Sequence, residues 1–132
     1  MADTTSVRVG TPSYQAYQIL HIAFTVAPLV AGVDKFFHFL VNWDMYLAPI
    51  VPRTLGMSGH TIMLGIGVVE VIAGLIVAVA PRIGGLIVGI WLLGIVVNLL
   101  AVPGYFDIAL RDFGLALGAF ALSRISVDYS DR

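Results

Sequence analysis

The chain carries a single carboxylate in the middle of a long apolar run. The run is GVVEVIAGLIV, residues 67–77, and Glu70 is its one ionisable residue. A charge at membrane depth costs about 2.5 to 3.5 kcal/mol unless it is paired or protonated. Its face of the predicted helix also holds Gly67, Ala73 and Gly74, which let another helix or a ligand come close. Glu70 therefore indicates either a buried ion pair that sets helix register or a polar pocket for a headgroup, a quinone or a proton.

Further polar residues within or beside the other apolar runs form a candidate polar cluster with Glu70. Counting at about 1.5 Å per residue places them in one half of the bilayer or at its midplane. Arg111 keeps its proton and needs an acid nearby: Asp107 precedes it by four residues, and Glu70 or Asp34 could reach it from a neighbouring helix. The candidate residues, for ligand binding or for packing, are Asp34, Lys35, Glu70, Asn98, Arg111 and Asp112.

The histidines and the absent motifs narrow the chemistry. His21 lies toward the cytoplasmic half of the first apolar run, whereas His38 and His60 lie near the outer boundary of the membrane, so no two evidently lie at one depth across a bundle, as a bis-histidine haem requires. A metal site made of His38, His60 and a carboxylate stays open, but no single helix has metal-ligand spacing, and we expect no metal. The chain has no cysteine, phosphate-binding glycine loop, nucleophile elbow or HExxH motif. We assign no catalytic residue and do not expect an enzyme.

Composition identifies the elements that must hold these residues. Of the 132 residues, 59% are hydrophobic and 11% are charged, and the mean hydropathy is +0.97. A soluble domain needs more polar surface than this, whereas nearly uncharged runs of about 20 residues are typical of membrane-spanning helices. The net charge of −1, without a basic cluster, gives no indication of nucleic-acid binding. We therefore predict an all-α integral membrane protein, a transmembrane four-helix bundle.

The predicted bundle is one domain over residues 14–127, with an interfacial segment between its first two helices. That segment, residues 38–57, mixes prolines with Trp43 and Tyr46, which suit the headgroup level of a membrane. A flexible tail, residues 1–13, ends where Thr11, Pro12 and Ser13 can start a helix. The predicted spans are about 14–37, 58–80, 82–102 and 105–125, followed by a frayed polar tail at 128–132.

Short turns and small residues indicate how the spans pack. PRIGG at residues 81–85 and the pair at 103–104 predict tight turns, which make the last three spans antiparallel neighbours. GxxxG spacing recurs at Gly85 with Gly89 and at Gly114 with Gly118, and it favours close helix packing. Both termini then share one side, and the positive-inside rule places that side in the cytoplasm. Its arginines are Arg8, Arg82, Arg124 and Arg132.

The order of these segments resembles the DoxX-like family of small bacterial four-span membrane proteins, over about residues 18–127. The matching stretches are AGVDKFFHFL, VVEVIAGLIVAVAPRIGGLIVGIW and YFDIALRDFGLALGAFALSRIS. The resemblance implies a four-helix transmembrane bundle with an interfacial stretch after the first helix, in the bacterial inner membrane. Some members are subunits of quinone-linked sulfur-oxidising complexes or partners of oxidative-stress enzymes. The family's recurring polar positions would here be Asp34, Lys35, Glu70, Arg111 and Asp112.

Three functions fit these observations. The first is a non-catalytic subunit or scaffold of a membrane assembly, with a quinone-linked redox complex as one candidate; short loops and small residues on the spans favour it. The second is a small-molecule site in which Glu70 and Arg111 hold a quinone oxygen or a lipid headgroup. The third is a proton or solute conductor, which needs an oligomer because one bundle has little room for water. The expected partners are the lipid bilayer and either other membrane proteins or further copies of the chain; no cofactor is evident, and quinone is the candidate ligand.

Overall fold

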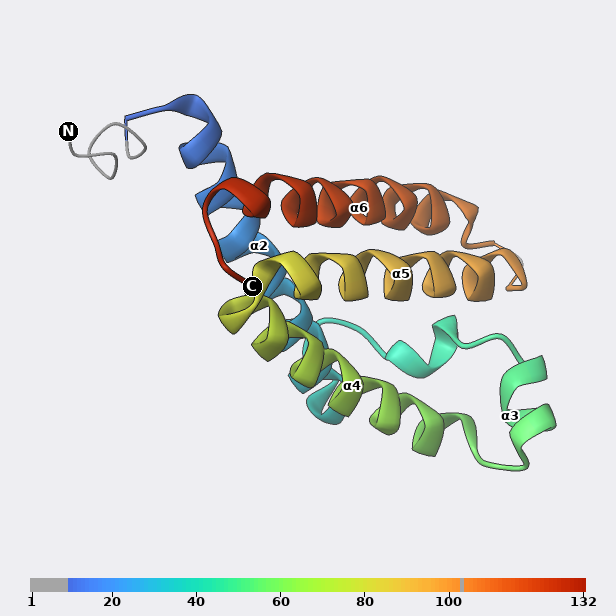
Figure 1. The fold of residues 1–132 in the computed structure, drawn as a ribbon. Helices are drawn as coiled ribbons and strands as arrows, with labels where there is room; N and C mark the ends of the chain where they lie inside the picture. The colour runs from blue at the N-terminus through green and yellow to red at the C-terminus, as the bar shows by residue number, and fades with distance from the viewer. Residues whose placement is uncertain (1–9, 103) are drawn as a thin grey trace.

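The computed structural model describes residues 10–102 and 104–132 of the chain, and the described part is helical without a strand. Four long helices follow one another in Figure 1, with short helical segments between the first two and after the last. The long helices are α2 (Pro12–Phe37), α4 (Gly59–Val79), α5 (Pro81–Leu100) and α6 (Phe106–Ile125). The short ones are η1 (Trp43–Tyr46), α3 (Ile50–Leu55) and η2 (Ser126–Asp128). The all-helical part of the prediction is thus confirmed.

Local capping explains where the helices begin. The Thr11 hydroxyl accepts a hydrogen bond from the Tyr14 amide at 3.3 Å, so α2 starts two residues before the predicted span. Ser58 caps α4 in the same way through the Thr61 amide, at 3.2 Å. Ala80 alone separates α4 from α5, so PRIGG forms the first turn of α5 rather than a separate turn. Residues 1–9 of the predicted tail, and Pro103, lie outside the described part.

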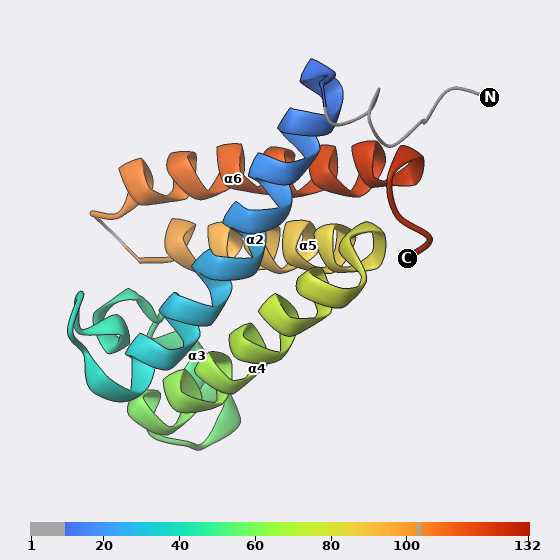
Figure 2. The same cartoon turned by 90° about the vertical axis from the view of Figure 1, so that its left-hand side faces the viewer.

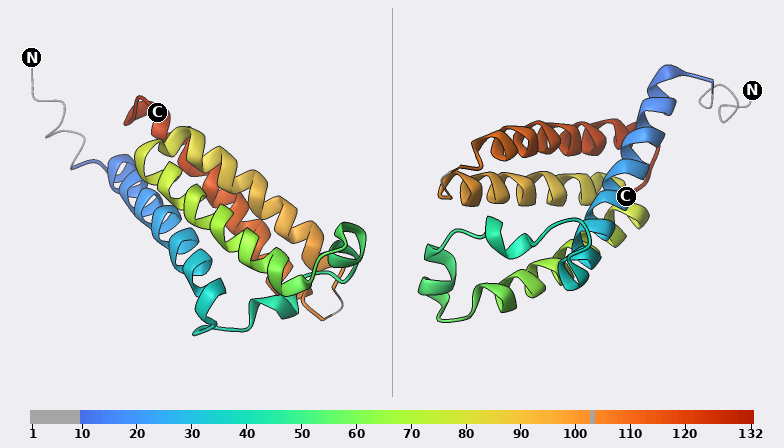
Figure 3. Two further views of the ribbon diagram at one scale, coloured as in Figure 1. Left: turned by 90° about the horizontal axis from the view of Figure 1, so that it is seen from below. Right: turned by 180° about the vertical axis from the view of Figure 1, so that it is seen from behind.

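The long helices pack as two pairs, α2 with α4 and α5 with α6. Figures 1 and 2 show the two pairs meeting at the end where α4 turns into α5. Toward the other end they diverge, and the segment that carries η1 and α3 lies between the diverging ends (Figure 3). The apolar core gathers near the joined end and draws on all four long helices: Tyr17, Phe24, Ala73, Val77, Val88, Ala119 and Leu122.

Glycine permits the closest helix contacts. A Cβ on Gly32 of α2 would lie 2.6 Å from the carbonyl oxygen of Gly67 in α4, and a Cβ on Gly67 would lie 2.8 Å from that of Gly32. In the second pair, Gly85 meets the Ala119 carbonyl and Gly89 meets an aromatic ring of α6. The packing role predicted for Gly85 and Gly89 is confirmed. Of the other GxxxG pair, Gly118 packs against Phe24, whereas no atom of the described residues lies within 4 Å of a Cβ on Gly114.

Three of the described helices, α2, α4 and α5, are long and apolar enough to cross a membrane. Large apolar side chains remain exposed along their outer faces, for example Ile22, Ile72 and Ile90. The α6 helix is 20 residues long, as α5 is, but it carries four charged residues, Asp107, Arg111, Asp112 and Arg124, so length and composition do not mark it as a span. Composition therefore supports three spans of the predicted four.

The C-terminal residues are packed rather than frayed, so that prediction is wrong. The ring of Tyr129 lies 5.3 Å, centroid to centroid, from the rings of both Tyr14 and Tyr17 at the start of α2. The Arg82 amide donates to the Arg132 carbonyl at 2.9 Å. Aromatic contact with the core outweighs the polar character of these last residues. The start of α2 and the end of the chain therefore lie at the same end of the protein.

Candidate functional site

The polar centre of the protein is a buried ion pair between Lys35 and Glu70. The Lys35 ammonium lies 3.0 Å from a Glu70 carboxylate oxygen, and the two side chains are 4% and 9% exposed. Gly32 and Gly67 lie one turn before these two residues, on the same faces of α2 and α4. Because α2 and α4 run antiparallel, Lys35 lies beside Gly67, with its Cβ 3.1 Å from where a Cβ on Gly67 would be, and its long side chain extends along α4 to the Glu70 carboxylate. Sequence reasoning placed Lys35 among the possible partners of Glu70 without deciding between them.

Trp43 closes this pair from the interfacial segment. Its ring centroid lies 3.9 Å from the Lys35 ammonium, a cation–π contact, and its indole N–H donates to an Asp34 carboxylate oxygen at 2.7 Å. Tyr46, the second predicted interfacial anchor, sets its ring edge-on to Trp43 and to Tyr105. Both side chains are only partly exposed. Trp43 thus belongs to the polar cluster, a role that the sequence did not reveal.

Asp34 ends α2 and folds the following segment over it. Its carboxylate accepts hydrogen bonds from the amides of Phe39, at 2.8 Å, and Leu40, at 3.1 Å, besides the indole of Trp43. His38 stands at the turn with a left-handed backbone, φ 56°. Each carboxylate oxygen therefore has partners inside the protein. Asp34 is a structural acceptor beside the ion pair.

Asn98 anchors the interfacial segment to α5. Its side-chain oxygen accepts from the Ala48 amide at 2.9 Å, and its side-chain nitrogen donates to the Tyr46 carbonyl at 2.7 Å. Ala48 is almost completely buried, at 1% exposed. These bonds satisfy backbone groups that would otherwise be buried unpaired. Asn98 thus fixes the position of the segment that covers the ion pair, and its side chain makes no hydrogen bond to the ion pair itself.

Arg111 pairs with its neighbour in the chain rather than with Glu70. Its guanidinium donates to one Asp112 carboxylate oxygen at 3.1 and 3.2 Å. The Arg111 side chain is 65% exposed, while that of Asp112 is 8% exposed. Asp112 and the Trp91 ring lie within electrostatic range of Glu70. The Trp91 indole N–H is buried beside the Glu70 carboxylate and makes no hydrogen bond of standard geometry among the described residues. The structure therefore brings together Lys35, Glu70 and Asp112, and leaves Arg111 outside.

The sequence alone places Trp91 at the same depth as Glu70. A single residue, Ala80, joins α4 to α5. Glu70 precedes this turn by ten residues and Trp91 follows it by eleven. Residues at equal distances from a tight antiparallel turn lie at equal depth. Depth alone does not give the rotation of either helix, so the contact itself required the structure.

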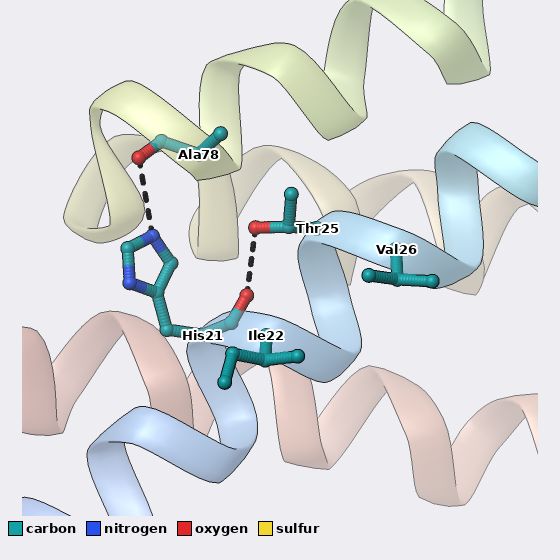
Figure 4. Close-up of a pocket in the computed structure, with 5 residues that line it drawn as sticks. All are labelled: His21, Ile22, Thr25, Val26 and Ala78. Carbon is teal, nitrogen blue, oxygen red and sulfur yellow. Dashed lines mark hydrogen bonds between the residues drawn. The ribbon is translucent and has the colours of Figure 1, made fainter.

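Two open apolar grooves border α2. Figure 4 shows the first, of about 220 Å³, where His21 Nε2 lies 3.2 Å from the Ala78 carbonyl oxygen and the Thr25 hydroxyl donates to the His21 carbonyl at 2.7 Å. The second groove measures about 570 Å³. It is lined by Leu29, Val30, Val33, Asp34, Phe37, Phe39 and Leu40. Neither groove is lined by Lys35 or Glu70, so neither gives a ligand access to the ion pair.

Comparisons with known proteins found no relative of this chain. No protein-family model matches the chain. No curated protein matches it significantly. The same holds for solved structures. The function must therefore be argued from the arrangement of the chain's own residues.

Proposed function

We propose that this protein is a four-span integral membrane protein of the DoxX-like type and acts as a non-catalytic subunit or scaffold of a membrane assembly. The observation that carries the proposal is the closed ion pair of Lys35 and Glu70. Both side chains are buried, they bond to each other, and Trp43 covers the ammonium. A buried ion pair of this kind can set helix register, because each charge is satisfied by the other rather than by a substrate. The apolar faces of the long helices then remain for lipid and for partner helices.

Several features of α6 support its assignment as the fourth span. It packs along α5 over its length (Figure 1), and large apolar side chains such as Leu110, Phe113 and Leu117 are exposed on it. Asp112 offsets the charge of Arg111 within the helix. Arg124 lies in the last turn, where a long basic side chain can reach the headgroups. A helix of 20 residues measures about 30 Å, the thickness of the hydrocarbon core.

We place both ends of the described chain in the cytoplasm of a bacterial cell. Arg82, Arg124 and Arg132 lie at the end shared by the start of α2 and the end of the chain, whereas the segment at the other end has Arg53. The positive-inside rule favours this orientation. The interfacial segment and the ion pair beneath it then belong to the outer half of the membrane.

Single cysteines test this orientation, because the natural chain has none. We expect Thr54→Cys, in α3, to react with a membrane-impermeant maleimide in intact cells. Asp131→Cys, at the other end, reacts only after the cells are opened. Both positions are exposed, so access rather than burial decides the labelling. If Asp131→Cys reacts in intact cells and Thr54→Cys does not, the protein has the opposite orientation. If both cysteines react from the same side, the segment between them crosses the membrane an even number of times, and the four-span topology is wrong.

Purification from native membranes in a mild detergent, followed by mass spectrometry, tests the scaffold role. We expect the protein to retain a membrane-protein partner in fixed stoichiometry. Glu70→Gln weakens the ion pair and should reduce the amount of assembled protein, whereas Asp107→Asn, an exposed change of the same kind, should not. Recovery of a lone homo-oligomer that carries quinone or lipid would contradict the scaffold and favour the small-molecule site.

A further inference from the structure

Three side chains with metal-binding chemistry meet at the end of the protein that carries the interfacial segment. His38, Asp44 and His60 each offer one ligand atom, and these atoms lie within 4.8 Å of one another. The Asp44 carboxylate accepts from His60 Nδ1 at 2.8 Å. The rings of His38 and His60 are stacked, with centroids 5.7 Å apart. His38 and His60 are 22 positions apart, at the two ends of the segment that joins α2 to α4, and Asp44 lies between them, so the cluster arises from the tertiary structure.

Each of the three residues is held by its own local structure. His38 follows α2 in a left-handed turn that the Asp34 carboxylate stabilises through the next two amides. Asp44 lies in η1, whose first turn is capped by the Asn42 side chain. His60 lies in the first turn of α4, which Ser58 caps. The cluster is therefore built from three positioned elements rather than from a mobile loop.

The ligand set and its spacing fit a transition-metal ion. Two imidazoles and a carboxylate suit Zn²⁺ and similar divalent ions, whereas Ca²⁺ and Mg²⁺ prefer oxygen alone. Two ligand atoms bound to tetrahedral zinc, each at about 2.0 to 2.1 Å from it, are separated by about 3.3 Å. The observed distances, from 2.8 Å to at most 4.8 Å, bracket that value. Small side-chain rotations would bring all three atoms onto one ion, with a further position open to water.

Two details point to a ligand beyond the hydrogen bond between Asp44 and His60. The second oxygen of Asp44, Oδ1, is buried and has no hydrogen-bond partner among the described residues. A buried unpaired carboxylate oxygen is costly, and a bound cation would offset that cost. His38 Nδ1 lies 3.3 Å from the Val41 carbonyl oxygen. A histidine that donates Nδ1–H to a carbonyl keeps the lone pair of Nε2 for a metal, which is the usual arrangement at metal sites.

We propose that His38, Asp44 and His60 bind one divalent transition-metal ion, such as Zn²⁺, which joins the end of α2 to the start of α4. The ion takes the place of the proton between His60 Nδ1 and Asp44, and that proton passes to solvent. From the sequence we expected no metal, because no single helix has the spacing of metal ligands. Three separate elements supply the ligands instead.

Zinc binding to the full chain, purified with a tag that contains no histidine and stripped with a chelator, tests the proposal. We expect one Zn²⁺ per chain by calorimetry and a shift of the unfolding temperature to higher values when zinc is added. His38→Ala, His60→Ala and Asp44→Asn should each weaken binding by about tenfold to a hundredfold or more. Co²⁺ should give the absorption bands of a low-coordinate site in the natural chain and lose them in the three variants.

His21→Ala is the matched control, because His21 lies near the other end of α2 and contacts the carbonyls of Val77 and Ala78. It should bind zinc as the natural chain does. Asp44→Asn keeps an acceptor for His60, so it separates loss of the ion from loss of the local fold. Circular dichroism of each variant without zinc confirms that it is folded. Binding that is absent at micromolar zinc, or equal in the natural chain and the three variants, would overturn the proposal.

Discussion

Lys35→Met should lower the free energy of unfolding by about 3 to 5 kcal/mol, the cost of leaving one partner of a buried ion pair alone. The Glu70 side chain is 9% exposed and would keep its carboxylate in an apolar setting without the ammonium 3.0 Å away. The variant also loses the cation–π contact with Trp43. Unfolding by a denaturing detergent, followed by circular dichroism in mixed micelles, measures the change.

The double variant Lys35→Met with Glu70→Leu decides whether the pair acts as a unit. It removes both charges, and exchanging a buried pair for apolar residues is often neutral or stabilising by about 1 to 4 kcal/mol. We therefore expect it to be more stable than either single variant, with a large coupling energy. Arg53→Met, on the exposed surface of α3, is the control and should change stability by less than about 1 kcal/mol. Additive effects of the two single changes would refute the pair.

Gly67→Ala is expected to destabilise the protein by about 1 to 3 kcal/mol, because its added methyl group overpacks a helix contact. The Cβ would lie 2.8 Å from the Gly32 carbonyl oxygen and 3.1 Å from the Lys35 Cβ. The nearest atom is backbone, so α2 and α4 must separate for the methyl group to fit. That separation lengthens the Lys35–Glu70 contact as well. Unfolding in mixed micelles again gives the free energy.

Gly65→Ala provides a control two residues earlier in the same helix. No atom in the described part of the chain lies within 4 Å of a Cβ at Gly65, which is exposed. The change should be neutral or stabilising by up to about 1 kcal/mol, the helix propensity of alanine over glycine. In a Trp91→Phe background, where Trp43 is the remaining tryptophan, Gly67→Ala should also shift the Trp43 fluorescence and Gly65→Ala should not. Equal effects of the two alanines would show that the glycine contact does not hold the pair.

The predictions for the Lys35–Glu70 pair and for Gly67 both concern the contact between α2 and α4, where close helix packing and charge burial depend on each other. Gly32 and Gly67 let the backbones touch, which places Lys35 beside Gly67, and the Lys35 side chain extends from there to Glu70. The interfacial segment then covers the pair with Trp43, while Asn98 holds that segment to α5. Under the proposed function, the polar residues of the outer half serve the architecture of the bundle. The metal site proposed at His38, Asp44 and His60 adds a ligand at the edge of the same segment.

Much of the fold follows from local sequence. Apolar runs of the right length predict the long helices, and side chains such as Thr11 and Ser58 predict their starts to within two residues. The rise per residue predicted that Lys35 and Glu70 lie in one half of the bilayer or at its midplane. The C-terminal residues were misjudged, because their polarity says nothing of the tyrosine cluster that Tyr129 joins. Helix ends are local features, whereas docking of a tail is not.

The sequence by itself determined an all-helical, strongly apolar chain with a polar cluster that includes Glu70, because helix formation and hydropathy depend on neighbours in the chain. Only the tertiary structure decided that Glu70 meets Lys35 and that Arg111 turns to Asp112. It likewise gathered His38, Asp44 and His60 from three elements. The physical reason is that rise per residue gives the height of a side chain along a helix, while its partner depends on helix rotation and on which backbones can approach. Contacts of about 3 Å are decided by that approach, which the glycines permit.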